Sequence, residues 1–133
     1  MSEANVEAVR RQWEAFERGD IDGFFADAAE DVEFEEDPAF PEAGTYRGRD
    51  EIVGYLVSFQ EQMTDHRFEV EELRDVGDGR VLALMHETAR GTTSGADVDQ
   101  HPAFLYEFRD GLIVRTRAYL YRTDAFAALG LDG

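Results

Sequence analysis

The sequence of 133 residues contains no cysteine and no lysine, and it has no long uninterrupted apolar run. Without cysteine, disulfides, cysteine-ligated metal centres and thiol catalysis are excluded. Without lysine, a Schiff-base mechanism and a lysine base are excluded. No apolar stretch reaches the roughly 18 residues that a membrane-spanning helix needs, and the N-terminal segment is amphipathic rather than signal-like. We therefore expect one soluble intracellular domain over residues 1–133.

The sequence has thirty acidic residues and thirteen arginines, which gives a formal net charge of −17 at pH 7. Such a charge repels nucleic acids and anionic membranes, so neither is expected as a partner. The 12% aromatic content indicates that the acidic surface encloses a packed core. The charge exceeds the magnitude of about 2–8 that suffices for solubility. It favours a cytoplasmic, halophilic protein, although a GC-rich genome would also favour arginine over lysine.

The apolar spacing predicts helices first and antiparallel strands afterwards. Apolar residues three and four positions apart indicate helices in the first half, and a period of two begins at residue 66. An Asp-Gly pair between the last two strands predicts a tight hairpin. This order is typical of an α+β domain whose curved sheet wraps around the N-terminal helices and leaves a pocket. The predicted elements cover residues 6–16, 21–28, 32–35, 49–63, 66–75, 80–90, 103–109, 112–121 and 124–129.

Three segments carry a family resemblance that extends over nearly the whole chain. WEAFERGDIDGFFADAAEDVEF, YRGRDEIVGYL and GLIVRTRAYLYRTDAFAALGL resemble the SnoaL-like, ketosteroid isomerase-like branch of the nuclear transport factor 2-like superfamily. The resemblance implies a conical barrel with the cystatin-like arrangement of helix and sheet, a deep apolar pocket, and a homodimer formed through the outer face of the sheet. It implies no single activity, because this fold hosts isomerases, polyketide cyclases, dehydratases, hydrolases and binding proteins.

The catalytic positions of the family are only partly kept. The tyrosine and the protonated aspartate of the ketosteroid isomerase oxyanion hole correspond to Gln12 and Phe104. The general-base aspartate of those enzymes corresponds best to Asp37, or to Glu36 if the register slips by one residue. The essential aspartate of limonene epoxide hydrolase corresponds to Ala118. Steroid isomerisation and epoxide hydrolysis are therefore not expected.

The same matching indicates which side chains face the pocket. His86 is the main catalytic candidate, because a neutral imidazole in an apolar cavity can accept or return a proton; it is alternatively a ligand-binding residue or a satisfied core histidine. Asp37 is a candidate base made more basic by desolvation, or it only begins a turn. Tyr55, Tyr106 and Gln12 are candidates to hold a ligand carbonyl. The residues expected to bind substrate are Gln12, Trp13, Phe16, Phe34, Tyr55, Phe68, Leu84, Thr88, Phe104, Tyr106, Thr116, Ala118 and Leu120.

Two functional interpretations remain open on the sequence alone. The first is a small-molecule enzyme that performs cofactor-free acid–base chemistry, namely isomerisation, cyclisation or dehydration, on an apolar carbonyl compound. The second is a non-catalytic binding protein for an apolar metabolite. The three histidines show no HxH or HxxxH spacing, so we expect neither a metal site nor a cofactor.

A homodimer is also expected from the strand pattern. Val81, Ala83 and Met85 are predicted to lie on the outer face of the sheet, together with Leu105, Tyr119 and Tyr121. Exposed to water, these side chains would form an apolar patch larger than monomers usually tolerate. A second copy of the chain is the simplest cover for such a patch.

The net charge of −17 generates a prediction about salt. Raising potassium chloride from about 0.1 M to about 3 M shortens the screening length from about 10 Å to below about 3 Å. Repulsion among the carboxylates then falls, and this relief favours the compact state. We expect the thermal midpoint, measured by circular dichroism, to rise steeply over this range. A flat or falling midpoint would contradict the halophilic interpretation.

Overall fold

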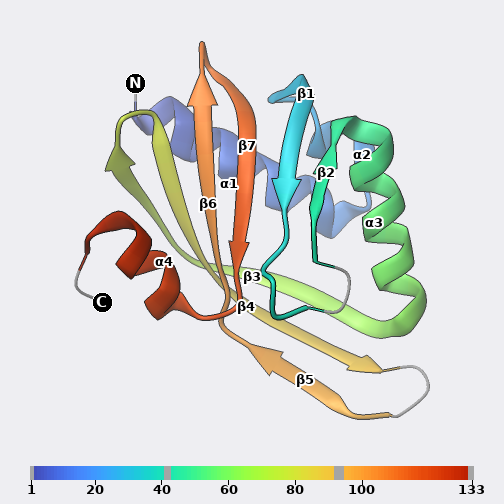
Figure 1. Ribbon diagram of the computed structural model, residues 1–133. Coiled ribbons are helices and arrows are strands. Elements are labelled where there is room, and N and C mark those ends of the chain that lie inside the picture. Colours follow the sequence, from blue (N-terminus) through green and yellow to red (C-terminus); the bar gives the residue numbers. More distant parts are fainter. Residues whose placement is uncertain (1, 41–42, 92–94, 132–133) are drawn as a thin grey trace.

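A single curved sheet organises the chain, and helices pack against both of its faces (Figure 1). The computed structural model describes residues 2–40, 43–91 and 95–131. The first helices precede most of the strands, as the apolar spacing predicts. In chain order the elements are α1 (Ser2–Arg18), α2 (Ile21–Phe24), β1 (Ala28–Glu35), β2 (Thr45–Arg47), α3 (Gly48–Gln62), β3 (Met63–Gly77), β4 (Arg80–Gly91), β5 (Asp97–Gln100), β6 (Ala103–Arg109), β7 (Leu112–Tyr119) and α4 (Arg122–Leu129).

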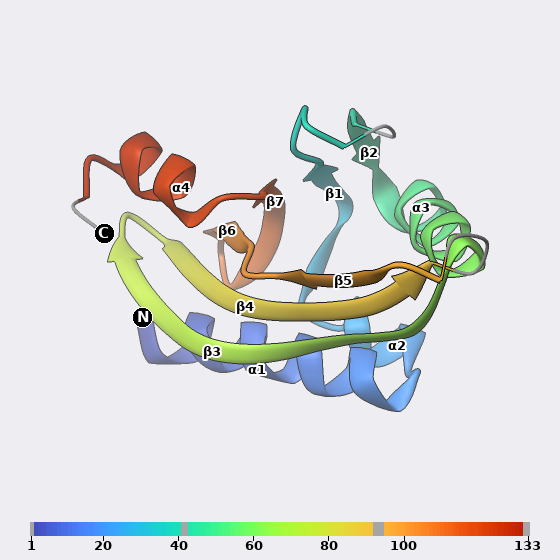
Figure 2. The ribbon, with the colours of Figure 1, turned by 90° about the horizontal axis from the view of Figure 1, so that it is seen from below.

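The sheet has the strand order β2-β1-β7-β6-β4-β3, and β5 pairs with β4. All of these neighbours are antiparallel except β1 and β7, which run parallel. Figure 2 shows the long strands β3 and β4 bending on their way to α3, with α1 and α4 on opposite sides. The sheet curls without closing, which confirms the predicted α+β class. Within the described part of the chain, no helix is long and apolar enough to cross a lipid bilayer.

Local sequence explains the hairpin that joins β6 and β7. Asp110 and Gly111 adopt φ angles of 53° and 79°, the left-handed conformation that both central residues of a type I′ turn require. The predicted strand 103–109 is confirmed, and the next strand ends two residues earlier than predicted. The short strands β2 and β5 were not predicted, because three or four residues show no clear alternation.

The facing of β4 differs from the prediction. Ala83 pairs with Phe104 and Val81 pairs with Tyr106 across the sheet, and directly paired residues share a face. Odd-numbered residues of β4, including Met85, therefore pack on the side of α1. Even-numbered residues lie on the outer side. Because β4 is apolar on both faces, its own alternation could not show which face is which.

The apolar cluster on the outer face of the sheet therefore differs from the outer patch on which the predicted homodimer was based. Leu82, Leu84, Leu105 and Tyr119 form this cluster, and α4 covers it with two buried side chains, Ala125 and Phe126. The placement of Val81, Ala83 and Met85 on the outer face is wrong, since all three are buried beside α1. Tyr121 is 61% exposed. The homodimer stays a prediction that now has less apolar surface to support it.

The facing of β4 can be tested by two neighbouring substitutions. Met85 is fully buried in the inner cluster, so Met85→Ala should lower the free energy of unfolding by about 2–5 kcal/mol. His86 lies partly exposed on the other face, and His86→Ala should lower the free energy of unfolding much less, because it removes only a partly exposed hydrogen bond. Urea denaturation measures both values. The opposite ranking would place the even-numbered residues of β4 in the inner core.

Candidate functional site

A cavity of about 90 Å³ lies between α1, α3 and the inner face of the sheet. Its wall is mainly aromatic and aliphatic: the indole of Trp13 lies 4.9 Å from the ring of Phe68 and 5.4 Å from that of Phe104. The volume is small beside ligand pockets of about 300–1,000 Å³, so the fitting ligand is small. The predicted site residues that line it are Gln12, Trp13, Phe16, Phe34, Tyr55, Phe68, Phe104, Tyr106, Thr116 and Ala118.

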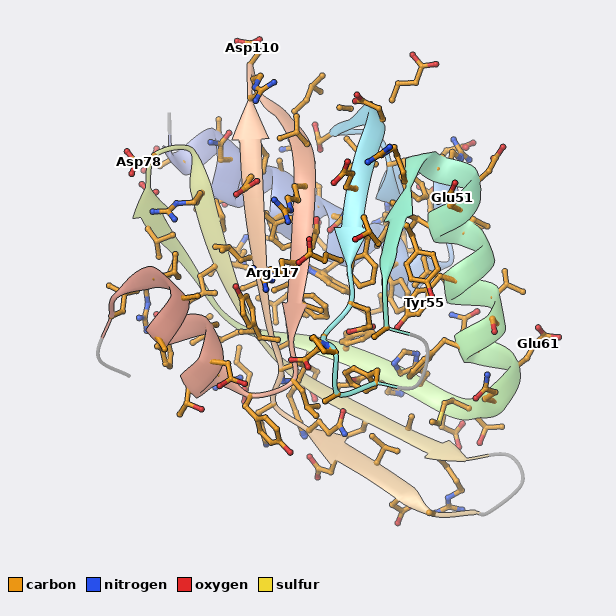
Figure 3. The ribbon with its side chains drawn as sticks, viewed as in Figure 1. Glu51, Tyr55, Glu61, Asp78, Asp110 and Arg117 are labelled. Atoms are coloured by element: carbon orange, nitrogen blue, oxygen red, sulfur yellow. The ribbon has the colours of Figure 1, made fainter. Side chains whose placement is uncertain are left out.

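Glu36 is one of three acids that line this cavity, with Glu33 and Glu87. Val32, Phe34 and Glu36 alternate along β1 and its extension, so they share the inner face. The Glu36 side chain is 9% exposed. The hydroxyl of Tyr55, which reaches across from α3 (Figure 3), donates a hydrogen bond to its Oε2, and the backbone N–H of Asp37 donates one of 2.8 Å to its Oε1.

Burial raises the pKa of Glu36 above its ordinary value, because the charged form loses hydration. The hydrogen bonds from Tyr55 and Asp37 oppose this shift, and the negative charges of Glu87 and Asp37 add to it. The pKa of Tyr55 is also raised, first by burial and then by the charge of Glu36. The tyrosine is therefore a hydrogen donor at neutral pH, and Glu36 is a carboxylate that binds a proton more readily than a solvated one.

A second acid–base pair lies in the same cavity. Nε2 of His66 is 2.8 Å from Oε2 of Glu87, and the two side chains are only 7% and 8% exposed. Nδ1 of His66 is buried without a hydrogen-bond partner among the described residues. A hydrogen on Nδ1 would be an unsatisfied buried donor, so we assign the hydrogen to Nε2, where it bonds to Glu87.

Gln12 and Tyr106 satisfy each other. The Tyr106 hydroxyl donates a 2.7 Å hydrogen bond to Oε1 of Gln12, whose Nε2 donates to the carbonyl of Phe24 at 3.3 Å. Burial raises the pKa of Tyr106, so it keeps its proton. The sequence predicts that both Gln12 and Tyr106 hold a ligand carbonyl. These bonds leave only one amide hydrogen of Gln12 for a ligand oxygen.

His86 does not face the cavity. It lies on the outer side of β4, where its Nε2 is 2.7 Å from Oδ1 of Asp99 and its side chain is 26% exposed. The hydrogen bond with Asp99 raises its pKa, so the expectation of a neutral, pocket-facing imidazole is wrong. Leu84 and Thr88 share this outer face for the same reason, the one-residue error in the facing of β4.

Asp37 is not among the cavity-lining residues either. Its Oδ1 accepts a hydrogen bond from the backbone of Ala39 and its Oδ2 one from Leu120, both of 2.8 Å. Both oxygens thus hold the loop against the end of β7, and of the two acids only Glu36 reaches the cavity. Leu120 follows the last residue of β7 and lies in a shallow groove beside α4, away from the cavity.

Sequence reasoning missed His66 and Glu87. A correct facing of β4 would have found Glu87, because an acid that follows Val81, Ala83 and Met85 at spacings of two shares their buried face. His66 lies near the start of β3, a long strand that bends toward α3. No local pattern indicates that it meets Glu87 twenty-one residues later.

The fold and the cavity together define a small α+β domain with acid–base groups buried in an apolar pocket. The family model of the SnoaL-like domain matches residues 9–116. The chain therefore belongs to the SnoaL-like domain family, and its fold is that of NTF2-like proteins. A comparison with curated proteins finds no match.

Solved structures of the same fold cover nearly the whole chain. An NTF2-like protein from Burkholderia thailandensis E264 is 25% identical with a TM-score of 0.82, over 94% of this chain and 96% of that one. TerC co-crystallised with polyporic acid is 22% identical with a TM-score of 0.79, over 95% and 97%. A ketosteroid isomerase-like protein from Catenulispora acidiphila DSM 44928 in complex with trimethylamine is 15% identical with a TM-score of 0.73, over 95% and 94%. These likenesses concern the fold.

The raised pKa of Glu36 generates a stability prediction. A carboxyl whose pKa is higher in the folded state contributes stability at low pH, and that contribution is lost as pH rises through the folded pKa. Glu36→Gln removes the titration. The variant should therefore gain stability relative to the wild type as pH rises above the ordinary glutamate pKa of about 4.3, by up to about 1.4 kcal/mol for each pH unit between the unfolded and folded pKa values.

Paired urea denaturations at several pH values measure this difference. The exposed Asp31 on β1 provides the control, because Asp31→Asn should show no comparable pH-dependent gain. A difference between Glu36→Gln and the wild type that is constant with pH would show that the carboxyl has the same pKa in both states.

Proposed function

We propose that the protein is a small-molecule enzyme that transfers protons without a cofactor, and that Glu36 accepts the proton from an apolar carbonyl compound in the cavity. The observation that carries the proposal is the burial of Glu36 at the wall of an apolar cavity, where its pKa is raised. A base whose pKa is closer to the working pH takes a proton from a weak carbon acid more readily.

In the proposed step the Glu36 carboxylate removes a proton from the carbon next to the carbonyl. The electron pair moves onto the carbonyl oxygen and forms an enolate. Once Glu36 is neutral, its hydrogen bond with Tyr55 loses its charge assistance. Tyr55 and the free amide hydrogen of Gln12 are then the donors that stabilise the enolate oxygen.

His66 and Glu87 supply a second proton carrier in the same cavity. Return of the proton to another carbon completes an isomerisation, attack of the enolate on a second carbonyl gives a cyclisation, and protonation of a leaving hydroxyl gives a dehydration. The carboxylate of Glu87 stabilises the imidazolium that forms when His66 takes up a proton. Membership of the SnoaL-like family supports this class of reaction.

A non-catalytic binding protein is the second candidate. It is favoured by the small volume of the cavity and by the hydrogen bonds from Tyr106 to Gln12 and from Gln12 to Phe24, which leave few donors for a developing charge. The small-molecule complex of the relative from Catenulispora acidiphila is compatible with either role. The two candidates differ in turnover and not in affinity.

Hydrogen–deuterium exchange separates the candidates without knowledge of the natural substrate. Small ketones such as 2-butanone and cyclohexanone are incubated with the protein in heavy water, and loss of their α-proton signals is followed by NMR. The wild type should accelerate exchange, and Glu36→Gln should reduce the acceleration by about 100-fold or more, the usual contribution of a positioned base.

Asp31→Asn is again the matched control, because Asp31 is an exposed acid on β1 outside the cavity. It should leave exchange unchanged. Binding of the same ketones is measured in parallel by saturation-transfer NMR. Ketones that bind to the wild type without accelerated exchange would overturn the enzymatic proposal and favour the binding protein.

A further inference from the structure

Two histidines and an aspartate meet on the outer side of β4, away from the cavity. His86 lies on β4, Asp99 on β5, and His101 directly after β5. One ligand atom from each residue lies within 4.8 Å of the others. The two imidazole rings are stacked, with centroids 4.6 Å apart and planes inclined by 4°. We propose that these three side chains bind a divalent first-row transition metal ion such as Zn²⁺.

The backbone pairing of β4 with β5 produces this arrangement. Glu87 pairs with Gln100 and Thr88 with Asp99, so His86 and His101 come opposite each other one step further along. Opposite residues share a face of the sheet. Asp99 shares it too, because it lies two residues before His101. The three side chains therefore converge through the geometry of the strands and not through a mobile loop.

The donor atoms are spaced for a single ion. Oδ1 of Asp99 lies 2.7 Å from Nε2 of His86 and 3.9 Å from Nε2 of His101. Zinc binds nitrogen and oxygen ligands at about 2.0–2.2 Å, which separates two ligand atoms of a tetrahedral site by roughly 3.3 Å. The observed separations lie on either side of this value. Because a metal ion lies in the plane of each imidazole that binds it, and the two stacked rings are parallel, at least one ring must rotate before both nitrogens bind the same ion.

The outer nitrogens of both rings face further carboxylates, and this is the second observation that points to a metal. Nδ1 of His101 is 3.3 Å from Oε1 of Glu71, within hydrogen-bonding distance, whereas Nδ1 of His86 is 3.7 Å from Oε1 of Glu69, an ion-pair distance too long for a hydrogen bond. Histidines that ligate metals usually donate their other N–H to a carboxylate, which fixes the ring. Arg122 in turn binds Glu71 and holds that carboxylate in position.

The ligand chemistry selects the ion. Two imidazoles with one carboxylate suit zinc, copper, nickel or iron, whereas Mg²⁺ and Ca²⁺ prefer oxygen ligands throughout. The side chains of Asp99 and His101 are 67% and 54% exposed, so water completes the coordination and the ion is exchangeable. The sequence expectation of no metal site rested on the spacing of the histidines and on the lack of enough converging ligands. The site is independent of Glu36 and of the proposed proton transfer.

Isothermal titration with Zn²⁺ tests the proposal. The full chain, without an affinity tag, is stripped with EDTA, exchanged into buffer at about pH 8 and titrated. One ion should bind per chain and raise the thermal midpoint. His101→Ala, which removes a ligand, and Asp99→Asn, which replaces a charged oxygen ligand by a neutral one, should each weaken Zn²⁺ binding by about tenfold or more.

Asp97→Asn is the matched control for Asp99→Asn. Asp97 is an exposed acid on the same strand, paired with Arg90 outside the cluster, and its replacement should leave Zn²⁺ binding unchanged. Mg²⁺ in place of Zn²⁺ should bind far more weakly at this site. Circular dichroism verifies the folding of each variant, and Asp99→Asn, which preserves side-chain volume, provides the test even if His101→Ala unfolds.

Two results would overturn the proposal. The first is Zn²⁺ affinity that is unchanged in both His101→Ala and Asp99→Asn, which would assign binding to scattered surface carboxylates. The second is equal binding of Mg²⁺ and Zn²⁺, which would show that the imidazoles take no part. Failure of the ketone exchange test would leave the metal proposal unaffected, because the two sites share no residue.

Discussion

The alternation of side chains along β4 decides what each face of this protein can do. Successive residues of a strand point to opposite faces, so one setting of the strand places every side chain. Met85 completes the packing against α1, and Glu87 continues the same face into the cavity, where it meets His66. His86 lies between them in sequence and reaches the outer face beside Asp99. One strand thus separates the cavity chemistry from the histidine cluster.

The buried carboxylates of the cavity are each stabilised by a specific hydrogen-bonding partner. Two of the glutamates that line the cavity are buried, and each has a hydrogen-bonding partner, Tyr55 for Glu36 and His66 for Glu87. A buried charge needs such partners, because water no longer stabilises it. In these apolar surroundings the negative charge of Glu87 also raises the pKa of Glu36. Burial of Glu36 lowers the stability of the folded protein, and the raised pKa that results is typical of groups at functional sites.

The outer face is divided between apolar and charged halves. Under α4 it is apolar, with Leu82 and Leu84 at its centre. Further across, on β7, it is charged: Arg115 and Arg117 both bind Glu35 of β1, and the guanidinium of Arg117 also lies 5.2 Å from the ring of Tyr119 (Figure 3). Because the half on β7 is charged, the outer face as a whole is less apolar than the sequence analysis predicts.

The sequence by itself determined the family, the α+β class, the Asp-Gly hairpin and the aromatic lining from α1, α3 and β6. These follow from local periodicity, turn chemistry and family motifs, which a short window of residues contains. Only the tertiary structure decided that Glu36 and not Asp37 reaches the cavity, and that His86 faces outward. The physical reason is that side chains alternate between the two faces of a strand. In a strand that is apolar on both faces, the local sequence does not indicate which face turns to the core, and pairing with neighbouring strands decides it.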